Sequence, residues 1–111
     1  MKNEEFDLIV KNRVRRIQET LLSKAGEYAS DSDRFHNFKI AARIVSGEEI
    51  TPERALLGMW RKHIVSVLDI IDRIDRGIIP SAELVDEKIV DTINYSILLE
   101  GLIAERRHDN N

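Results

Sequence analysis

The sequence contains no cysteine and only two prolines. The lack of cysteine excludes disulfide bonds, thiolate zinc sites and cysteine nucleophiles. Only five glycines accompany the two prolines in 111 residues, so few of the residues that interrupt helices are present. This composition leaves room for long helices without covalent cross-links.

A strong charge of one sign and a long apolar run are also lacking. The formal net charge is -3, from 17 basic and 20 acidic residues, which gives no electrostatic basis for binding duplex DNA or RNA. No apolar run approaches the roughly 20 residues of a membrane span, and residues 1–5 do not resemble the start of a signal peptide. We therefore expect a soluble, cytoplasmic protein whose partners include neither duplex nucleic acid nor a membrane.

Apolar residues recur at helical spacing in four segments. The hydrophobic fraction of 42% and the charged fraction of 33% are ordinary for amphipathic helices and argue against disorder. Caps strengthen two of the starts, with Thr51 before Pro52 and Ser81 after Pro80. The sequence predicts helices over about 4–28, 34–46, 52–76 and 82–106 in a single all-α, four-helix bundle-like domain spanning 1–111.

The first and third predicted helices are longer than the short second helix can cover. Each apolar stripe needs a facing partner, and the ends of these two helices would extend beyond theirs. We therefore expect a homo-oligomer, a dimer or larger, to complete the core.

The most distinctive stretch is an acidic run, residues 83–95, within the last predicted helix. At 100° per residue, Glu83, Glu87, Asp91 and Asn94 fall within one arc of about 80°. Glu87 and Asp91 are one helical turn apart, a spacing at which two carboxylates can share a Mg²⁺ ion. The alternative is that Glu83, Asp86 and Glu87 only favour the helix start, and that Asp91 pairs with a lysine or arginine.

The three histidines are far apart in the sequence and belong to no recognisable nucleophile motif. His63 projects from an apolar stripe, which favours a packed, hydrogen-bonded histidine over a ligand or base. No glycine-rich phosphate loop is present. The carboxylates are thus the better candidates for chemistry.

Several short motifs occur in an order found in a known family. They are Lys24-Ala25-Gly26-Glu27-Tyr28-Ala29, Asp33-Arg34-Phe35-His36-Asn37-Phe38, Thr51-Pro52-Glu53, Lys62-His63, and Asp86-Glu87-Lys88 with Asp91 and Asn94-Tyr95. In this order the chain resembles small phage-type proteins related to the MazG-like all-α nucleotide pyrophosphatases. The resemblance spans about residues 24–106.

This resemblance implies an oligomeric helical bundle with a nucleotide site and, in active enzymes, Mg²⁺ held by the pairs E-x-x-E and E-x-x-D. The sequence departs from that pattern. The third predicted helix offers Lys62, Ser66 and Asp69 instead of E-x-x-E, and the only E-x-x-D on the last helix, Glu83 to Asp86, is in its first turn. Fewer acids and an available lysine suit binding a phosphate-bearing ligand better than cleaving it.

We assign roles to the candidate site residues on this basis. Lys62 would contact phosphate, Asn37 and Asn94 would read a base or ribose edge, and Tyr28 or Tyr95 would stack on a base. Core packing is an equal alternative for both tyrosines. The full predicted ligand-binding set is Glu27, Tyr28, Asn37, Lys62, Ser66, Asp69, Glu87, Asp91, Asn94 and Tyr95.

Three hypotheses follow for the function. The first is an oligomeric protein of the host cytoplasm, if phage-encoded, that binds a nucleotide-derived ligand and sequesters it, as sponges for nucleotide immune signals do. The second is a Mg²⁺-dependent nucleoside triphosphate pyrophosphatase, with Glu87 and Asp91 as metal ligands and Asp69 or Glu27 completing the site. The third is a helical interaction module without a small-molecule ligand.

Overall fold

Four α-helices make up the fold in the computed structural model, which describes residues 1–23, 33–44 and 50–110. In chain order they are α1 (Asn3–Ser23), α3 (His36–Ile44), α4 (Pro52–Asp75) and α5 (Ala82–Asp109). All regular secondary structure in these ranges is helical. The predicted all-α, four-helix, bundle-like architecture is therefore confirmed.

The starts of α4 and α5 lie where the sequence predicts them, because each has a side-chain cap. The hydroxyl oxygen of Thr51 accepts a hydrogen bond from the N–H of Arg54 at 3.1 Å, and that of Ser81 accepts one from Leu84 at 3.2 Å. α5 continues three residues beyond its predicted end at Arg106. The predicted helical residues 24–28 and 45–46 lie outside the described parts.

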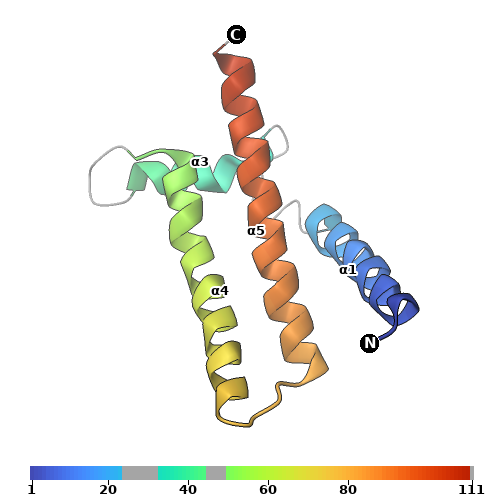
Figure 1. Cartoon of the computed structure of the whole chain (residues 1–111). Coiled ribbons are helices and arrows are strands. Elements are labelled where there is room, and N and C mark those ends of the chain that lie inside the picture. The colour runs from blue at the N-terminus through green and yellow to red at the C-terminus, as the bar shows by residue number, and fades with distance from the viewer. Residues whose placement is uncertain (24–32, 45–49, 111) are drawn as a thin grey trace.

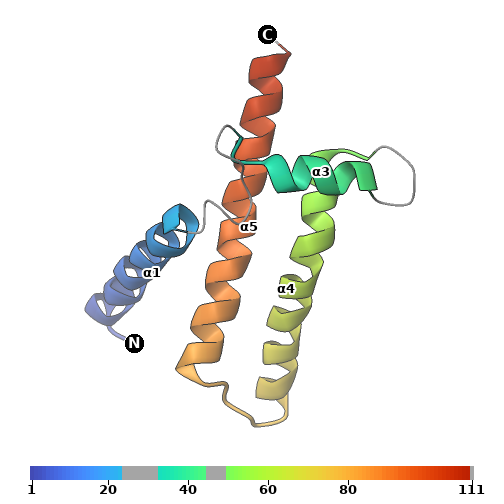
Figure 2. The same cartoon turned by 180° about the vertical axis from the view of Figure 1, so that it is seen from behind.

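α4 and α5 form an antiparallel hairpin, and the other two helices are placed around it (Figure 1). The link between them turns at Gly77, whose φ of 83° lies in the left-handed region that favours glycine. α3 crosses one side of the hairpin, as Figure 2 shows from behind, and α1 lies beside α5. Among the described residues, no helix crosses the side of the hairpin opposite α3.

The hydrophobic core lies where α3, α4 and α5 meet. Phe38 of α3 and Leu56 of α4 are fully buried, and they pack against Tyr95, Leu98 and Leu102 of α5. Full burial of a side chain of this kind stabilises the fold by roughly 1.5–3 kcal/mol. This cluster packs α3 against one half of the α4–α5 hairpin, and α1 contributes no fully buried side chain to it.

Ion pairs join α1 to α5, and Leu21 near the end of α1 packs against the core. Arg13 and Arg16 form ion pairs with Asp86, at 2.7 and 3.0 Å. The apolar side chains of α1 stay largely exposed, with Phe6 57% and Val14 49% exposed. The amphipathic pattern predicted for this helix is present, but within one chain most of its apolar stripe has no partner among the described residues.

Among the described residues, no helix has the length and apolarity needed to cross a bilayer.

Candidate functional site

The acidic stretch of α5 is divided between the two helices that flank it. Asp86 and Asn94 contact α1, whereas Asp91 contacts α4. Glu83 and Glu87 stay exposed. The residues of the predicted polar arc therefore do not form one site: Asn94 faces α1, Asp91 faces α4, and the two glutamates face solvent.

Asp91 lies against a histidine of α4. Its carboxylate oxygen is 3.4 Å from Nδ1 of His63, and the two side chains are about a quarter exposed. The His63 ring in turn lies 5.0 Å from the Tyr95 ring, tilted by 33°. The packed reading of His63 is therefore the one that the geometry favours, with Asp91 as its partner.

Tyr95 is part of the hydrophobic core and only 7% exposed. Its ring packs near Phe38 and Leu56. A ring in this position cannot present its face to a base without rearrangement of the core. Of the two roles predicted for Tyr95, core packing is the one that this structure favours.

Asn94 joins α5 to α1. Its Nδ2 donates a hydrogen bond to Oγ1 of Thr20 at 2.8 Å, and that hydroxyl donates to the carbonyl of Arg16. Its Oδ1 is buried and has no hydrogen-bond donor among the described residues. Asn94 therefore acts as a helix-to-helix contact in this arrangement, with one acceptor left over.

Asp86 is a contact residue that sequence reasoning assigned to the helix start instead. It accepts hydrogen bonds from Arg16 and Arg13, and these cations hold the pKa of its carboxyl below the usual value. The two arginines lie at least 70 residues away in the sequence. No local pattern in the last helix could have shown this pairing.

A small depression between α4 and α5 brings together two predicted residues and two basic ones. It has a volume of about 90 Å³ and is lined by Ser66, Asp69, Ile70, Arg73, Leu84 and Lys88. The Ser66 hydroxyl donates to the carbonyl of Lys62 at 3.0 Å, one turn earlier on α4. Two of the three predicted α4 residues, Ser66 and Asp69, therefore lie together here.

Arg73 and Lys88 were not in the predicted site. The nearest carboxylate to Lys88 in an ion pair is Glu87, at 3.7 Å, and Arg73 has no ion pair among the described residues. Both basic groups can therefore take an additional anionic partner. Arg73 lies four residues after Asp69 on α4, a spacing that places the two side chains on the same face of the helix.

The remaining predicted residues do not converge on this depression. Lys62 is exposed on α4, and Asn37 is exposed on α3. Glu27 and Tyr28 lie outside the described residues. Within the described ranges, no three aspartate, glutamate or histidine side chains converge to hold a metal ion, so Glu87 and Asp91 form at most part of a magnesium site.

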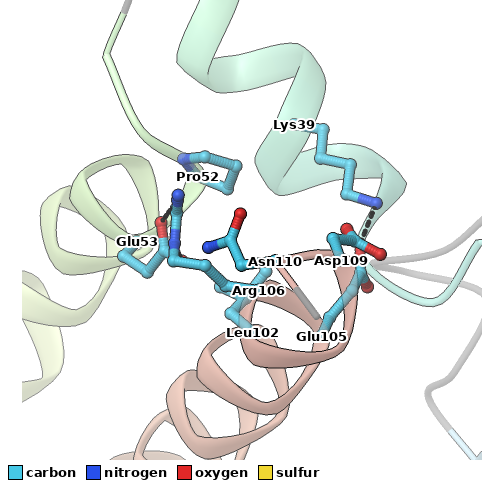
Figure 3. Close-up of a pocket in the computed structure, with 8 residues that line it drawn as sticks. All are labelled: Lys39, Pro52, Glu53, Leu102, Glu105, Arg106, Asp109 and Asn110. Carbon is cyan, nitrogen blue, oxygen red and sulfur yellow. Dashed lines mark hydrogen bonds and ion pairs between the residues drawn. The ribbon is translucent and has the colours of Figure 1, made fainter.

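A second, more polar pocket lies at the other end of the hairpin, between α3, α4 and α5 (Figure 3). Arg106 donates two hydrogen bonds to Glu53, at 2.9 and 2.7 Å, and Lys39 pairs with Asp33 at 2.7 Å and with Glu105. Arg106 lowers the pKa of Glu53, and Lys39 lowers that of Asp33. The Lys39–Glu105 and Arg106–Glu53 pairs link different helices, whereas Lys39–Asp33 is local to the start of α3. No predicted site residue lines the pocket.

Comparisons of the chain with protein-family models, with curated proteins and with solved structures find no match. The likeness to MazG-like proteins therefore remains a prediction from the motif order. The chain is a small all-α protein of four helices, with a polar depression between α4 and α5 as its candidate site.

Proposed function

We propose that this protein binds a phosphate-bearing, nucleotide-derived ligand at the α4–α5 depression and retains it without cleaving it. The observation that carries the proposal is the pair of basic groups, Arg73 and Lys88, beside the hydroxyl of Ser66. A guanidinium and an ammonium group together suit phosphate oxygens, because charge-assisted hydrogen bonds to phosphate are strong.

The size of the depression limits what it can hold. A volume of about 90 Å³ suits a phosphate group and is far below the roughly 300–1,000 Å³ of sites that enclose a drug-sized ligand. The rest of a nucleotide would therefore lie outside it, along the exposed surface. Lys62, one turn from Ser66, extends the basic surface in one direction.

The relation to MazG-like phage proteins belongs to the same proposal. The helical fold and the motif order support it, and a sponge that sequesters a nucleotide immune signal fits the shortage of acidic ligands. Binding without turnover is what such a role requires.

Magnesium-dependent pyrophosphatase activity is the second candidate. Its support is the pair Glu87 and Asp91, one turn apart on α5. Further oxygen ligands would have to come from water, from the substrate or from outside the described residues, since two carboxylates alone do not fill six positions around Mg²⁺. This candidate predicts pyrophosphate release that stops with chelator or with Asp91→Ala.

The test begins with protein purified without added nucleotide. Denaturation and mass spectrometry identify any small molecule that is released, and titration calorimetry with ATP and with inorganic pyrophosphate measures binding directly. We expect binding that Arg73→Gln weakens at least about tenfold, as the loss of a charge-assisted hydrogen bond would. Arg61→Gln, an exposed arginine on the same helix that does not line the depression, is the matched control.

Turnover is measured in the same samples after Mg²⁺ is added. Intact ATP and no pyrophosphate release support sequestration, whereas release that is abolished in Asp91→Ala supports the enzyme. If no phosphate compound is released or bound, the proposal is wrong and the interaction-module hypothesis takes its place.

A further inference from the structure

The single chain exposes more surface than a compact protein of its mass. Its accessible area is 8164 Å², compared with about 6,300 Å² expected for a folded monomer of 12.8 kDa. Its radius of gyration is 16.7 Å, whereas about 13 Å is expected for a compact domain of 111 residues. The excess of about 1,900 Å² needs a physical explanation.

One apolar part of this surface runs over α1 and α5. On α1 it comprises Phe6, Ile9, Val10 and Val14, which form a groove with Val85 and Ile89 of α5. Leu99 and Ile103 continue the apolar surface along α5 to a further depression. We call these eight residues the apolar face. The two helices that carry it, α1 and α5, lie side by side in Figures 1 and 2.

The α5 part of the apolar face has the spacing of a helix–helix seam. Four apolar residues and two hydroxyl residues follow one another along α5 at alternating steps of four and three residues. They are Val85, Ile89, Thr92, Ser96, Leu99 and Ile103. Such a repeat is typical of a helix that packs along another helix by knobs into holes.

The two hydroxyl residues do not interrupt this seam. Thr92 donates to the carbonyl of Lys88 at 2.9 Å, and Ser96 donates to the carbonyl of Thr92 at 3.1 Å. Their hydroxyls are therefore satisfied within α5, and another helix can pack over them without leaving a polar group unpaired. The core-facing stripe of α5 includes Tyr95, Leu98 and Leu102, and Leu99 lies at the border of the two, partly buried against the core.

We infer that the apolar face is the interface of a homodimer. If each copy buried the excess of about 1,900 Å², the total would lie within the roughly 2,000–5,000 Å² of obligate homodimers. Area of this size matches a permanent partner rather than a transient one. An identical chain supplies a seam of the same length and spacing.

The charges at the border of the apolar face also fit a second copy. Glu100 and Arg107 line the depression that contains Leu99 and Ile103, and neither has an ion pair among the described residues. In a two-fold arrangement each patch faces an identical patch on the other chain. A patch that carries both signs of charge can then place Glu100 of one chain opposite Arg107 of the other. A strongly charged partner would instead call for one sign.

The mass of the protein in solution tests this inference, measured by light scattering after size exclusion and by sedimentation equilibrium. We expect twice 12.8 kDa for the natural sequence at micromolar concentration. A mass of 12.8 kDa at every concentration would overturn the inference.

Two matched pairs of variants locate the interface. Ile9→Asp and Leu8→Asp change neighbouring residues of α1 that are 49% and 58% exposed, but only Ile9 lies in the groove. Ile103→Asp and Ile97→Asp change two residues of α5 that are both 38% exposed, and only Ile103 belongs to the seam. Ile9→Asp and Ile103→Asp should halve the mass, and Leu8→Asp and Ile97→Asp should keep it. Equal loss in both members of a pair would contradict the assigned surface.

A variant of an obligate dimer can unfold when it dissociates, so a second measurement uses the natural sequence alone. Its melting temperature should rise with protein concentration, because association stabilises only the folded chain. A melting temperature that does not depend on concentration would overturn the inference even if the aspartate variants do not fold.

Discussion

Gly101 of α5 makes room for the ring of Phe35, which precedes α3. A Cβ atom placed on Gly101 would lie 2.6 Å from Cζ of that ring, closer than carbon atoms approach one another. The glycine, although it weakens an isolated helix, therefore sets how closely the entrance to α3 packs on α5.

Alanine at this glycine and at a second helical glycine should have opposite effects. A Cβ atom placed on Gly58 of α4 would have no other atom within 4 Å, so Gly58→Ala should raise the free energy of unfolding by about 1 kcal/mol. Gly101→Ala gains the same helical preference but must displace Phe35, so we expect it to lower that free energy. Urea unfolding of both variants measures the difference, and a stabilised Gly101→Ala would show that the ring moves easily.

Phe38 should be among the costliest core positions. It is fully buried, and truncation to alanine leaves a cavity between α3, α4 and α5, at a cost of about 3–5 kcal/mol. Ile79, which is 88% exposed in the α4–α5 link, provides the control, since Ile79→Ala should change stability by no more than about 0.5 kcal/mol. Denaturant midpoints compare the two, and a similar cost for both would contradict the position of the core.

The cap of α4 can be tested by a pair of substitutions at one residue. Thr51→Ala removes the oxygen that accepts from the N–H of Arg54, and we expect a loss of about 1 kcal/mol. Thr51→Ser keeps a hydroxyl at the same position and should be close to neutral. Thermal unfolding followed by circular dichroism distinguishes them, and an equal loss in both would assign the effect to the methyl group instead.

Stability should fall in acid because three carboxylates take part in ion pairs in the folded state. The pKa values of Asp86, Asp33 and Glu53 are lowered in the folded state, mainly by Arg16, Lys39 and Arg106 respectively. A carboxyl whose pKa is lowered on folding stabilises the protein above its unfolded pKa of about 4, and this contribution is lost as the pH falls through the folded pKa.

Asp86→Asn isolates the share that attaches α1. Its melting temperature should lie below that of the natural sequence near pH 7, and the difference should shrink as the pH falls below about 4. Asp72→Asn, an exposed aspartate of α4 without an ion pair among the described residues, should leave the acid dependence unchanged. A gap between Asp86→Asn and the natural sequence that stays constant with pH would contradict this role.

Local signals predicted the helices well because caps and apolar spacing depend on neighbours in the sequence. Thr51-Pro52 and Ser81 placed two helix starts correctly. The site was harder to predict because helical periodicity tells which residues share a face of one helix. It does not tell which residues of another helix that face contacts. Asp91 and Asn94 share an arc on α5, yet one contacts His63 and the other Thr20. Arg73 and Lys88 become neighbours only when α4 and α5 pack together.

The position of α1 at the edge of the hairpin has a consequence for how the chain folds. The link between α4 and α5 is short, so closing this hairpin costs little loop entropy. The pair Arg13–Asp86 spans 73 residues, and α1 gains few apolar contacts when it docks. Within one chain we therefore expect the hairpin to assemble first and α1 to join last. At protein concentrations low enough to dissociate the proposed dimer, amide exchange should be fastest in α1 and slowest around Phe38 and Leu98.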